Sequence, residues 1–389
     1  MTFTSTSGPS SRNLLRALCR RCRKSLRQGV RQTDADRYVK TYDSVGFATA
    51  LLGFFLLGLQ SLRELQIRLR DDRALRQAVG WGGISVSQLN KVQHRRPPQL
   101  WEPVIAALMQ QVQVGSLPSH LRLMDTSFFR MSLKLLSRHY AKRMDRGTAG
   151  IKLGLILDPE QGAPVQWITR VGQGADTLCL DDLFPKDADI AGLTFLFDRG
   201  FTKYAFFQDL ITRGAHFVTR ALARTHYRVL EERPLDPAKP TIVADQVVIL
   251  GRRESRNLMT SPVRRVMLKT EKDTLVFLTS DFELTAWEVT ELYRRRWEIE
   301  IFFRWLKRNL NCLQPLGHSI EAAEHTFYAA LAAHLLVLLL LPKANNEQAG
   351  TPHQKAKKRG QPLKSTLQHI RAGLYQPPTQ ECLEALGFL

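Results

Sequence analysis

The sequence predicts an α/β fold in which a layer of strands and helices follows a helical N-terminal region and is interrupted by an all-β insertion. Three observations predict it. In the N-terminal region, residues 1–112, the segment 36–112 has few β-branched runs, and its Leu and Arg residues recur at helical spacing. Residues 113–342 alternate strand-like and helix-like segments. Within them, residues 221–282 hold short β-rich runs between polar turns. Residues 343–389 are predicted to form a basic linker and a C-terminal helical segment.

The chain is strongly basic. Of its 389 residues, 56 are Lys or Arg and 36 are Asp or Glu, which gives a formal net charge of +20 and a pI of about 10.1. A charge of this size points to a polyanionic partner, because each cation that meets a phosphate releases condensed counterions. The alternative is a solvated basic surface, but such a surface binds nucleic acid in any case. Nucleic acid is therefore the expected partner.

Cysteine usage and apolar runs bear on location. The five cysteines are odd in number and scattered, which favours a reducing compartment over a disulfide framework. Cys19 and Cys22 form a CxxC pair, but no second pair follows to complete a zinc site. Residues 1–11 lack the apolar core of a signal peptide. The uncharged run Ser44–Leu62 approaches membrane-spanning length, but its three glycines favour a buried helix. Leu331–Leu341 is too short to span and is predicted as a core helix.

The N-terminal region is basic and helical in pattern. Residues 1–35 form either a flexible arm or a frayed basic helix. Leu62–Leu69 has helical spacing, Gly80–Gly83 breaks it, and Ser85–Arg96 is a second short helix stopped by Pro97. Two helices joined by a turn suit a small DNA-docking module, and ordinary helical packing is an equally good interpretation. The second helix ends in the basic side chains Lys91, His94, Arg95 and Arg96.

From Leu121 the pattern becomes that of a strand–helix layer. The run Leu193–Phe197 is almost continuously apolar, which is typical of a central strand covered on both faces. The predicted strands are Leu121–Ser127, Ile151–Leu157, Val165–Val171, Leu193–Phe197 and His216–Thr219, and the predicted helices are Thr177–Leu183 and Tyr204–Thr212. The insertion has predicted strands at Thr241–Leu250, Val263–Lys269 and Thr274–Leu278, and a helix begins near Ala286.

Two aspartates stand where predicted strands end. Asp125 lies near the end of the first strand, and Asp198 follows the run Leu193–Phe197 just before a glycine turn. Rigid strand ends are suited to presenting carboxylates to hard cations. Phosphoryl transfer on DNA uses two such ions about 4 Å apart. The alternative is that both aspartates cap the segments that follow.

The helix predicted after the insertion carries an unusual stripe. Tyr293, Arg296, Glu300 and Lys307 are separated by three, four and seven residues, which places them on one face. A carboxylate among a phenol, a guanidinium and an ammonium fits a metal ligand set among phosphate contacts. The alternative is a solvated helix with ion pairs such as Arg296–Glu300. Glu298 points elsewhere and is not expected to be a ligand.

This Tyr-x2-Arg-x3-Glu-x6-Lys spacing resembles the signature of the insertion-sequence-four family of bacterial DDE transposases. The resemblance covers most of the chain, with Asp125 in Leu-Met-Asp-Thr-Ser and Asp198 in Phe-Asp-Arg-Gly-Phe. It implies a ribonuclease H-like catalytic domain with the β insertion between Asp198 and Glu300, preceded by a helical N-terminal DNA-binding domain. It further implies that Asp125, Asp198 and Glu300 are catalytic and bind two Mg²⁺ ions, for which Mn²⁺ substitutes.

The same resemblance implies a reaction and its partners. An insertion-sequence transposase binds the terminal inverted repeats of its element and performs cut-and-paste cleavage and strand transfer on double-stranded DNA. It acts as a homodimer in the synaptic complex, with a hairpin intermediate. Tyr293, Arg296 and Lys307 then hold the phosphates at the transposon end, and Trp297 is assigned as a further DNA contact. Such a protein is expected in the bacterial cytoplasm, at the nucleoid and away from the membrane.

Two departures from the family pattern bear on the hairpin step. Phe201 stands where the second motif usually has Tyr, which removes a hydroxyl and keeps the ring. Some relatives stack a flipped base on a Trp of the β insertion, but this chain has no Trp between Trp167 and Trp287. Trp297 or Phe277 is left to stack on a flipped base. For Trp297, packing in the core is the alternative.

Two rival functions stay open. One is a nuclease of the same fold that cuts without strand transfer, and the β insertion and basic signature helix argue against it. The other is a DNA-binding protein derived from a decayed element, and the intact acidic triad and signature argue against that.

Overall fold

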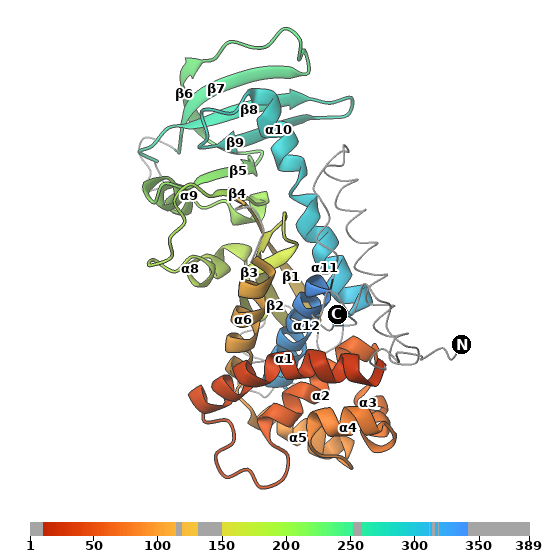
Figure 1. Ribbon diagram of the computed structural model, residues 1–389. Helices are drawn as coiled ribbons and strands as arrows, with labels where there is room; N and C mark the ends of the chain where they lie inside the picture. Colours follow the sequence, from red (N-terminus) through yellow and green to blue (C-terminus); the bar gives the residue numbers. More distant parts are fainter. Residues whose placement is uncertain are drawn as a thin grey trace, which may run out of the picture.

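The computed structural model describes residues 11–113, 119–130, 150–251, 259–310, 312, 316–317 and 319–340. The predicted linker and helical segment 343–389 lie outside these residues. Figure 1 shows the N-terminal helices at one end, part of a sheet in the middle and the β insertion at the other end.

The N-terminal helices pack around a helix from the far end of the chain, α12 (Ile320–Leu339). They are α1 (Ser11–Gln32), α2 (Ser44–Leu57), α3 (Leu62–Asp71), α4 (Arg73–Val79), α5 (Val86–Arg95), the 3₁₀ helix η1 (Pro98–Trp101) and α6 (Glu102–Gln113). Of the two interpretations of the basic segment before residue 35, the helix is confirmed from Ser11 and the flexible arm is wrong there, because Leu18, Cys19, Cys22 and Leu26 of α1 are buried in the core. Burial raises the pKa of the Cys22 thiol to about 12, which disfavours the thiolate that zinc would need.

The predicted first helix of the docking module is two helices. α3 ends at Asp71, and the side chain of Asp72 accepts hydrogen bonds from the N–H groups that begin α4. The second helix is confirmed as α5, which Ser85 caps in a reciprocal pair with Gln88. The chain between α4 and α5 turns through Gly83, whose φ is 72°.

The two apolar runs are buried helices, as predicted. α2 is buried along most of its length and ends at Gly58, which has a φ of 70°. Among the described residues, α12 is long and apolar enough to cross a membrane, and α2 with α3 would pass the same test as a pair bent by 103°. However, 83% of the apolar window of α12 is buried inside the protein.

Within the described residues, nine strands form one mixed sheet in the order β3-β2-β1-β4-β5-β9-β8-β7-β6. They are β1 (Leu121–Arg130), β2 (Gly150–Asp158), β3 (Ala163–Val171), β4 (Thr194–Leu196), β5 (His216–Arg220), β6 (Tyr227–Glu232), β7 (Ile242–Leu250), β8 (Val263–Lys269) and β9 (Thr274–Thr279). The pairs β1–β4 and β4–β5 are parallel and the others are antiparallel.

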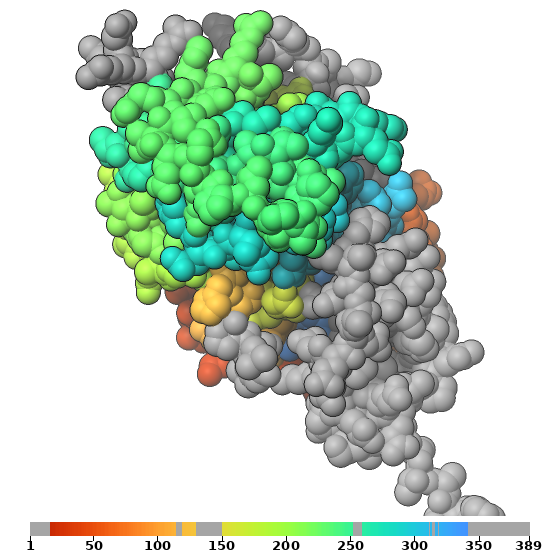
Figure 2. Space-filling model, turned by 90° about the horizontal axis from the view of Figure 1, so that it is seen from above, coloured from red at the N-terminus to blue at the C-terminus, as the bar shows by residue number. Residues whose placement is uncertain are grey.

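The insertion extends this sheet. β9 pairs with β5, so β6 to β9 continue the layer that β1 to β5 begin. In Figure 2 the insertion, green to teal, covers much of the end of the molecule that is seen from above. The strand β6 was not predicted. β1 is longer than predicted, because Phe128 and Phe129 continue its pairing with β2.

Helices cover both faces of the central strands. The remaining elements are η4 (Asp176–Cys179), α8 (Leu180–Leu183), η5 (Arg199–Phe201), α9 (Tyr204–Thr212), α10 (Ala286–Arg294) and α11 (Trp297–Asn309). α8 and α9 share one hydrophobic core with Met124 of β1, whereas α11, α12 and the N-terminal helices share the other with Leu123. Side chains along β1 therefore alternate between the two faces.

Two buried histidines of α12 form hydrogen bonds to residues of other elements. The indole N–H of Trp101 donates to Nδ1 of His325 at 2.9 Å, and that of Trp305 donates to Nδ1 of His334 at 3.0 Å. Each Nε2 lies next to a backbone carbonyl, so both rings are neutral with the proton on Nε2. Burial lowers the pKa of each from 6.5 to about 4.

Acid is expected to destabilise the fold through these rings. The unfolded chain takes up protons at its histidines below pH 6.5, whereas the folded chain does so only near pH 4, so stability falls as the pH is lowered through this window. At pH 5 each histidine is expected to cost about 2 kcal/mol. Urea unfolding at pH 7 and pH 5 measures this difference in the free energy of unfolding. The double variant His325→Gln/His334→Gln should lose this part of the difference, and an unchanged difference would contradict the assignment.

Candidate active site

Asp125 lies in the middle of β1. The prediction that it stands near the strand end is wrong, because β1 continues beyond Phe129. However, β4 pairs with β1 only as far as Leu123, so Asp125 lies just beyond the end of its parallel neighbour. Strand alternation directs Asp125 to the face of Leu123, the face on which α11 packs. Its side chain is 19% exposed and accepts the N–H of Thr126 at 2.7 Å.

Asp198 follows β4 by two residues and begins η5. Its Oδ1 accepts the N–H of Gly200 at 2.6 Å, so Asp198 does cap the segment that follows, as the alternative interpretation held. The capping carboxylate is also close enough to Asp125 to raise the pKa of that residue. Capping and a role in the site are therefore compatible.

The stripe of polar residues is carried by two helices. The prediction of one continuous helix is wrong, because α10 and α11 are separated by a turn at Arg295 and Arg296. The N–H groups of these residues donate to Leu292 and Tyr293, three residues back, and the backbone stays right-handed helical. In Figure 1, α11 follows α10 along one side of the molecule. Glu298 pairs with Arg295 at 2.9 Å.

Arg296 lies between two of the three predicted ligands. Its Nη2 is 2.6 Å from Oε1 of Glu300, and its Nη1 is 3.8 Å from Oδ2 of Asp125. The predicted i,i+4 pair therefore exists, but it also reaches across to β1. Arg296 is only 12% exposed, and its Cζ is 5.8 Å from the ring centre of Tyr293.

The other accessory residues differ in their surroundings. Lys307 donates to Oγ of Ser127 at 2.6 Å, two residues along β1 from the first aspartate, and burial lowers its pKa. Tyr293 packs its ring on Phe277, which is 2% exposed and therefore has no free face for a base. Trp297 is 47% exposed, so core packing is wrong for it.

The surroundings of Asp125 disfavour the charged form of its carboxyl group. Burial raises the pKa of Asp125 to about 7, and the carboxylates of Asp198 and Glu300 add to this, while the Thr126 N–H and Arg296 oppose it. Three carboxylates from three elements are the hard oxygen donors that a divalent cation takes. In this structure the guanidinium of Arg296 lies between two of these carboxylates, those of Asp125 and Glu300. As the side chains stand, no group of three or more acidic, His or Cys residues among those described is arranged to hold an ion.

A fourth acidic residue, which the sequence does not predict as part of the site, lies near it. Asp176 of η4 accepts a hydrogen bond from Oγ1 of Thr126 at 2.5 Å and from Nζ of Lys152 at 2.7 Å. It follows a glycine-rich turn after β3, in a stretch that also holds Asp181 and Asp182. Nothing in the sequence pattern separates it from those two.

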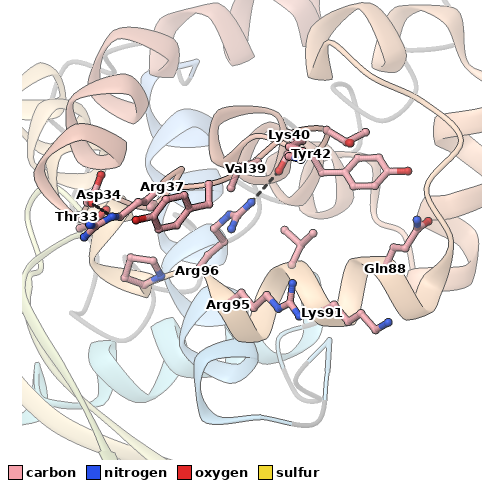
Figure 3. A pocket seen from close by; sticks show the side chains of 15 residues that line it. Thr33, Asp34, Arg37, Val39, Lys40, Tyr42, Gln88, Lys91, Arg95 and Arg96 are labelled. Carbon is pink, nitrogen blue, oxygen red and sulfur yellow. Dashed lines mark hydrogen bonds and ion pairs between the residues drawn. The ribbon is translucent and has the colours of Figure 1, made fainter.

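A basic groove of about 740 Å³ lies in the N-terminal helical region, between α5 and the loop that follows α1. Its cationic lining residues are Arg37, Lys40, Lys91, Arg95 and Arg96 (Figure 3). Lys91 and Arg95 are four residues apart and share one face of α5. Arg96 is 8% exposed and donates to the carbonyl of Tyr42 at 2.9 Å, so it supports the loop. His94, predicted with this basic group, pairs with Glu321 at 3.1 Å.

The loop side of the groove presents an aromatic ring. Tyr38 is 87% exposed, although its φ of 63° is a conformation that non-glycine residues rarely adopt. The guanidinium carbon of Arg37 lies 5.1 Å from the centre of its ring. Residues held in this region of backbone conformation cluster at binding sites.

Comparison with known proteins gives the class to which this fold and site belong. Residues 118–336, more than half of the chain, match the family described as "Transposase DDE domain". The chain therefore belongs to this family of transposase enzymes, which use divalent metal ions.

Two relatives carry the comparison further. "Putative transposase y4zB" of Sinorhizobium fredii is 29% identical over 199 residues, which cover 48% of this chain and 52% of the relative. "Probable transposase for insertion sequence element IS5377" of Geobacillus stearothermophilus is 23% identical over 202 residues, which cover 51% of this chain and 52% of the relative. This chain thus spans about half the length of both.

Proposed function

We propose that this protein is the transposase of an insertion sequence, which binds the terminal inverted repeats of its element and cuts and rejoins double-stranded DNA. The observation that carries the proposal is the bridge of Arg296 between Asp125 and Glu300, beside Asp198, within the segment that matches the DDE family. The strand order β3-β2-β1-β4-β5, with an antiparallel meander joined to parallel strands, supports a ribonuclease H-like catalytic domain.

In this proposal Asp125, Asp198 and Glu300 hold two Mg²⁺ ions, which Mn²⁺ can replace. The bound ions supply charge stabilisation at the reacting phosphate. With the carboxylates bound to ions, Arg296 would be available to hold the phosphate oxygens of the transposon end with its planar fork. Tyr293 borders Arg296, and Lys307 adds a point charge on the same side. Each cut and each joining step is an in-line displacement that needs no covalent enzyme intermediate, so the protein supplies position and charge.

The wider features of the proposal follow the insertion-sequence-four resemblance. The protein works as a homodimer that holds both ends, cleaves by a cut-and-paste route through a DNA hairpin, and is found at the bacterial nucleoid. Exposed Trp297 beside Arg296 is the aromatic side chain best placed to meet a base, because Phe277 is covered by Tyr293.

The helical N-terminal region is proposed as the DNA-binding domain, with the basic groove as its phosphate contact. Neutralising two of its cations should reduce the salt dependence of end binding. The double variant Lys91→Ala/Arg95→Ala is expected to bind the duplex end about tenfold more weakly near physiological salt. Its slope of log K against log salt should be shallower by about 2. Fluorescence anisotropy measures both.

A charge-matched control separates this groove from the net charge of the protein. Lys269→Ala/Lys272→Ala removes two exposed cations from β8 and the turn that follows it, in the β insertion. This control should keep the wild-type slope. Equal slopes for the two double variants would show that the groove has no special part in binding.

Strand cleavage tests the proposed function. Purified protein is incubated with Mg²⁺ and a labelled duplex that carries the inverted-repeat end of its own element. Wild type and Glu298→Gln should cut at the element boundary and give hairpin or joined products, whereas Glu300→Gln should bind without cutting. Cutting without joined products would favour the simple nuclease. Binding without cutting by wild type would favour the decayed DNA-binding protein.

A further inference from the structure

One carboxylate outside the proposed triad connects the two segments that carry Asp125 and Asp198. Oδ1 of Asp176 accepts hydrogen bonds from Oγ1 of Thr126 and from Nζ of Lys152. Thr126 follows Asp125 in β1, and its N–H donates to the Asp125 carboxylate. Strand alternation places the Thr126 side chain on the face opposite α11. Asp176 therefore holds β1 from behind the candidate site.

The other oxygen of Asp176 meets the turn that carries Asp198. A Cβ atom at Gly200 would lie 2.6 Å from Oδ2 of Asp176 and 2.8 Å from Oδ1 of Asp198. Only a residue without a side chain lets both carboxylates come this close to the turn. The helix η4 of Asp176 packs against η5 at this point. Asp176 thus contacts both β1 and the Asp198 turn.

Lys152 fixes the orientation of the Asp176 carboxylate. Its side chain is 9% exposed on β2, and it also donates to the carbonyl of Gly174. The side chain of Asp176 is 30% exposed, and its ion pair with Lys152 adds little net stability, because the loss of hydration offsets the attraction between the charges. Its effect is on geometry. Lys152 and Thr126 both bind Oδ1, which leaves Oδ2 of Asp176 directed at Gly200.

We propose that Asp176 is a positioning residue that sets the separation of Asp125 and Asp198, so that the two carboxylates can bind a common divalent cation. The inference rests on the proposed function, because it takes the triad as the metal site. Groups that hold metal ligands in place change metal affinity by about 10–100-fold when they are removed.

Mn²⁺ binding to the full chain, followed by the electron paramagnetic resonance signal of the free ion, tests the inference without an activity assay. Thr126→Val keeps the shape of the side chain and removes only the hydroxyl that binds Asp176. It is expected to weaken Mn²⁺ binding about tenfold, and Asp176→Ala by at least as much. DNA-end affinity and the melting temperature of Thr126→Val should stay near those of wild type.

The chain offers a matched control on β3, which β2 separates from β1. Oγ1 of Thr169 donates to a carboxylate oxygen of Glu324 at 2.5 Å, the same length as the Thr126–Asp176 bond. Thr169→Val should therefore bind Mn²⁺ as wild type does. Wild-type affinity in Thr126→Val and Asp176→Ala would overturn the inference and leave the triad intact. Failure of wild type itself to bind Mn²⁺ would overturn the proposed metal site and the inference with it.

Discussion

Replacing Asp125 by asparagine is expected to abolish DNA cleavage and to stabilise the fold at pH 8. Loss of one metal ligand removes several kcal/mol of charge stabilisation, which corresponds to a fall in cleavage rate of about 10³-fold or more. Stability moves the other way, because burial raises the pKa of this carboxyl to about 7 and the folded state is strained by its charge above that value.

The pH dependence follows from the raised pKa. Between pH 3.9, where the unfolded carboxyl titrates, and about pH 7, the folded state binds more protons than the unfolded state, so the contribution of Asp125 to stability falls as pH rises. Urea unfolding should therefore find Asp125→Asn more stable than wild type by about 4 kcal/mol at pH 8 and about equal at pH 4. A variant that is less stable than wild type at pH 8 would show that Asp125 is not under this strain.

Replacing Arg264 by methionine is expected to cost about 4 kcal/mol of folding free energy, because it leaves the buried carboxylate of Asp245 with only Arg233, whose partly exposed Nε is 3.9 Å away. Arg264 is 1% exposed, and its Nη2 and Nε lie 2.7 and 3.2 Å from the two oxygens of Asp245. It also donates to the carbonyls of Asp281 and Leu284, which lie just before α10. The pair therefore ties the insertion to the helix that leads into the candidate site.

A double variant separates the buried charge from simple loss of packing. Arg264→Met/Asp245→Leu removes both charges, so it should be more stable than Arg264→Met in urea unfolding at neutral pH. If the double variant is the less stable of the two, the ion pair is not the source of the effect. Weaker DNA cleavage in Arg264→Met, measured below its unfolding temperature, would show that the insertion also supports the site.

Sequence pattern predicted the fold where local signals and burial agree. The helix α9 has the bounds that were predicted, and Leu193–Phe197 contains the central strand β4. The edge strand β6 was missed because all its side chains are exposed and only its pairing with β7 defines it. The basic segment before residue 35 gave no clear pattern, since the stripe that α1 buries is narrow and surrounded by arginines.

The sequence also predicts the candidate site only where its residues lie close together along the chain. Spacing along the chain was enough to bring Arg296 and Glu300 together, because four residues make about one helical turn. The break before Trp297 was not predictable, because the sequence there has no Pro or Gly and only the structure shows Arg295 bound to Glu160. Asp176 was missed for a similar reason, since its partners are brought to it by the sheet.

The proposed metal site is tested most directly by locating Mn²⁺ by anomalous scattering in crystals of the full chain grown with the ion. Mn²⁺ is expected within about 2.5 Å of oxygen atoms of Asp125, Asp198 and Glu300. Arg296 is expected to have turned away from Asp125 to make room. Mn²⁺ bound elsewhere, with Arg296 still between Asp125 and Glu300, would contradict the proposal that these three residues form the metal site of a transposase.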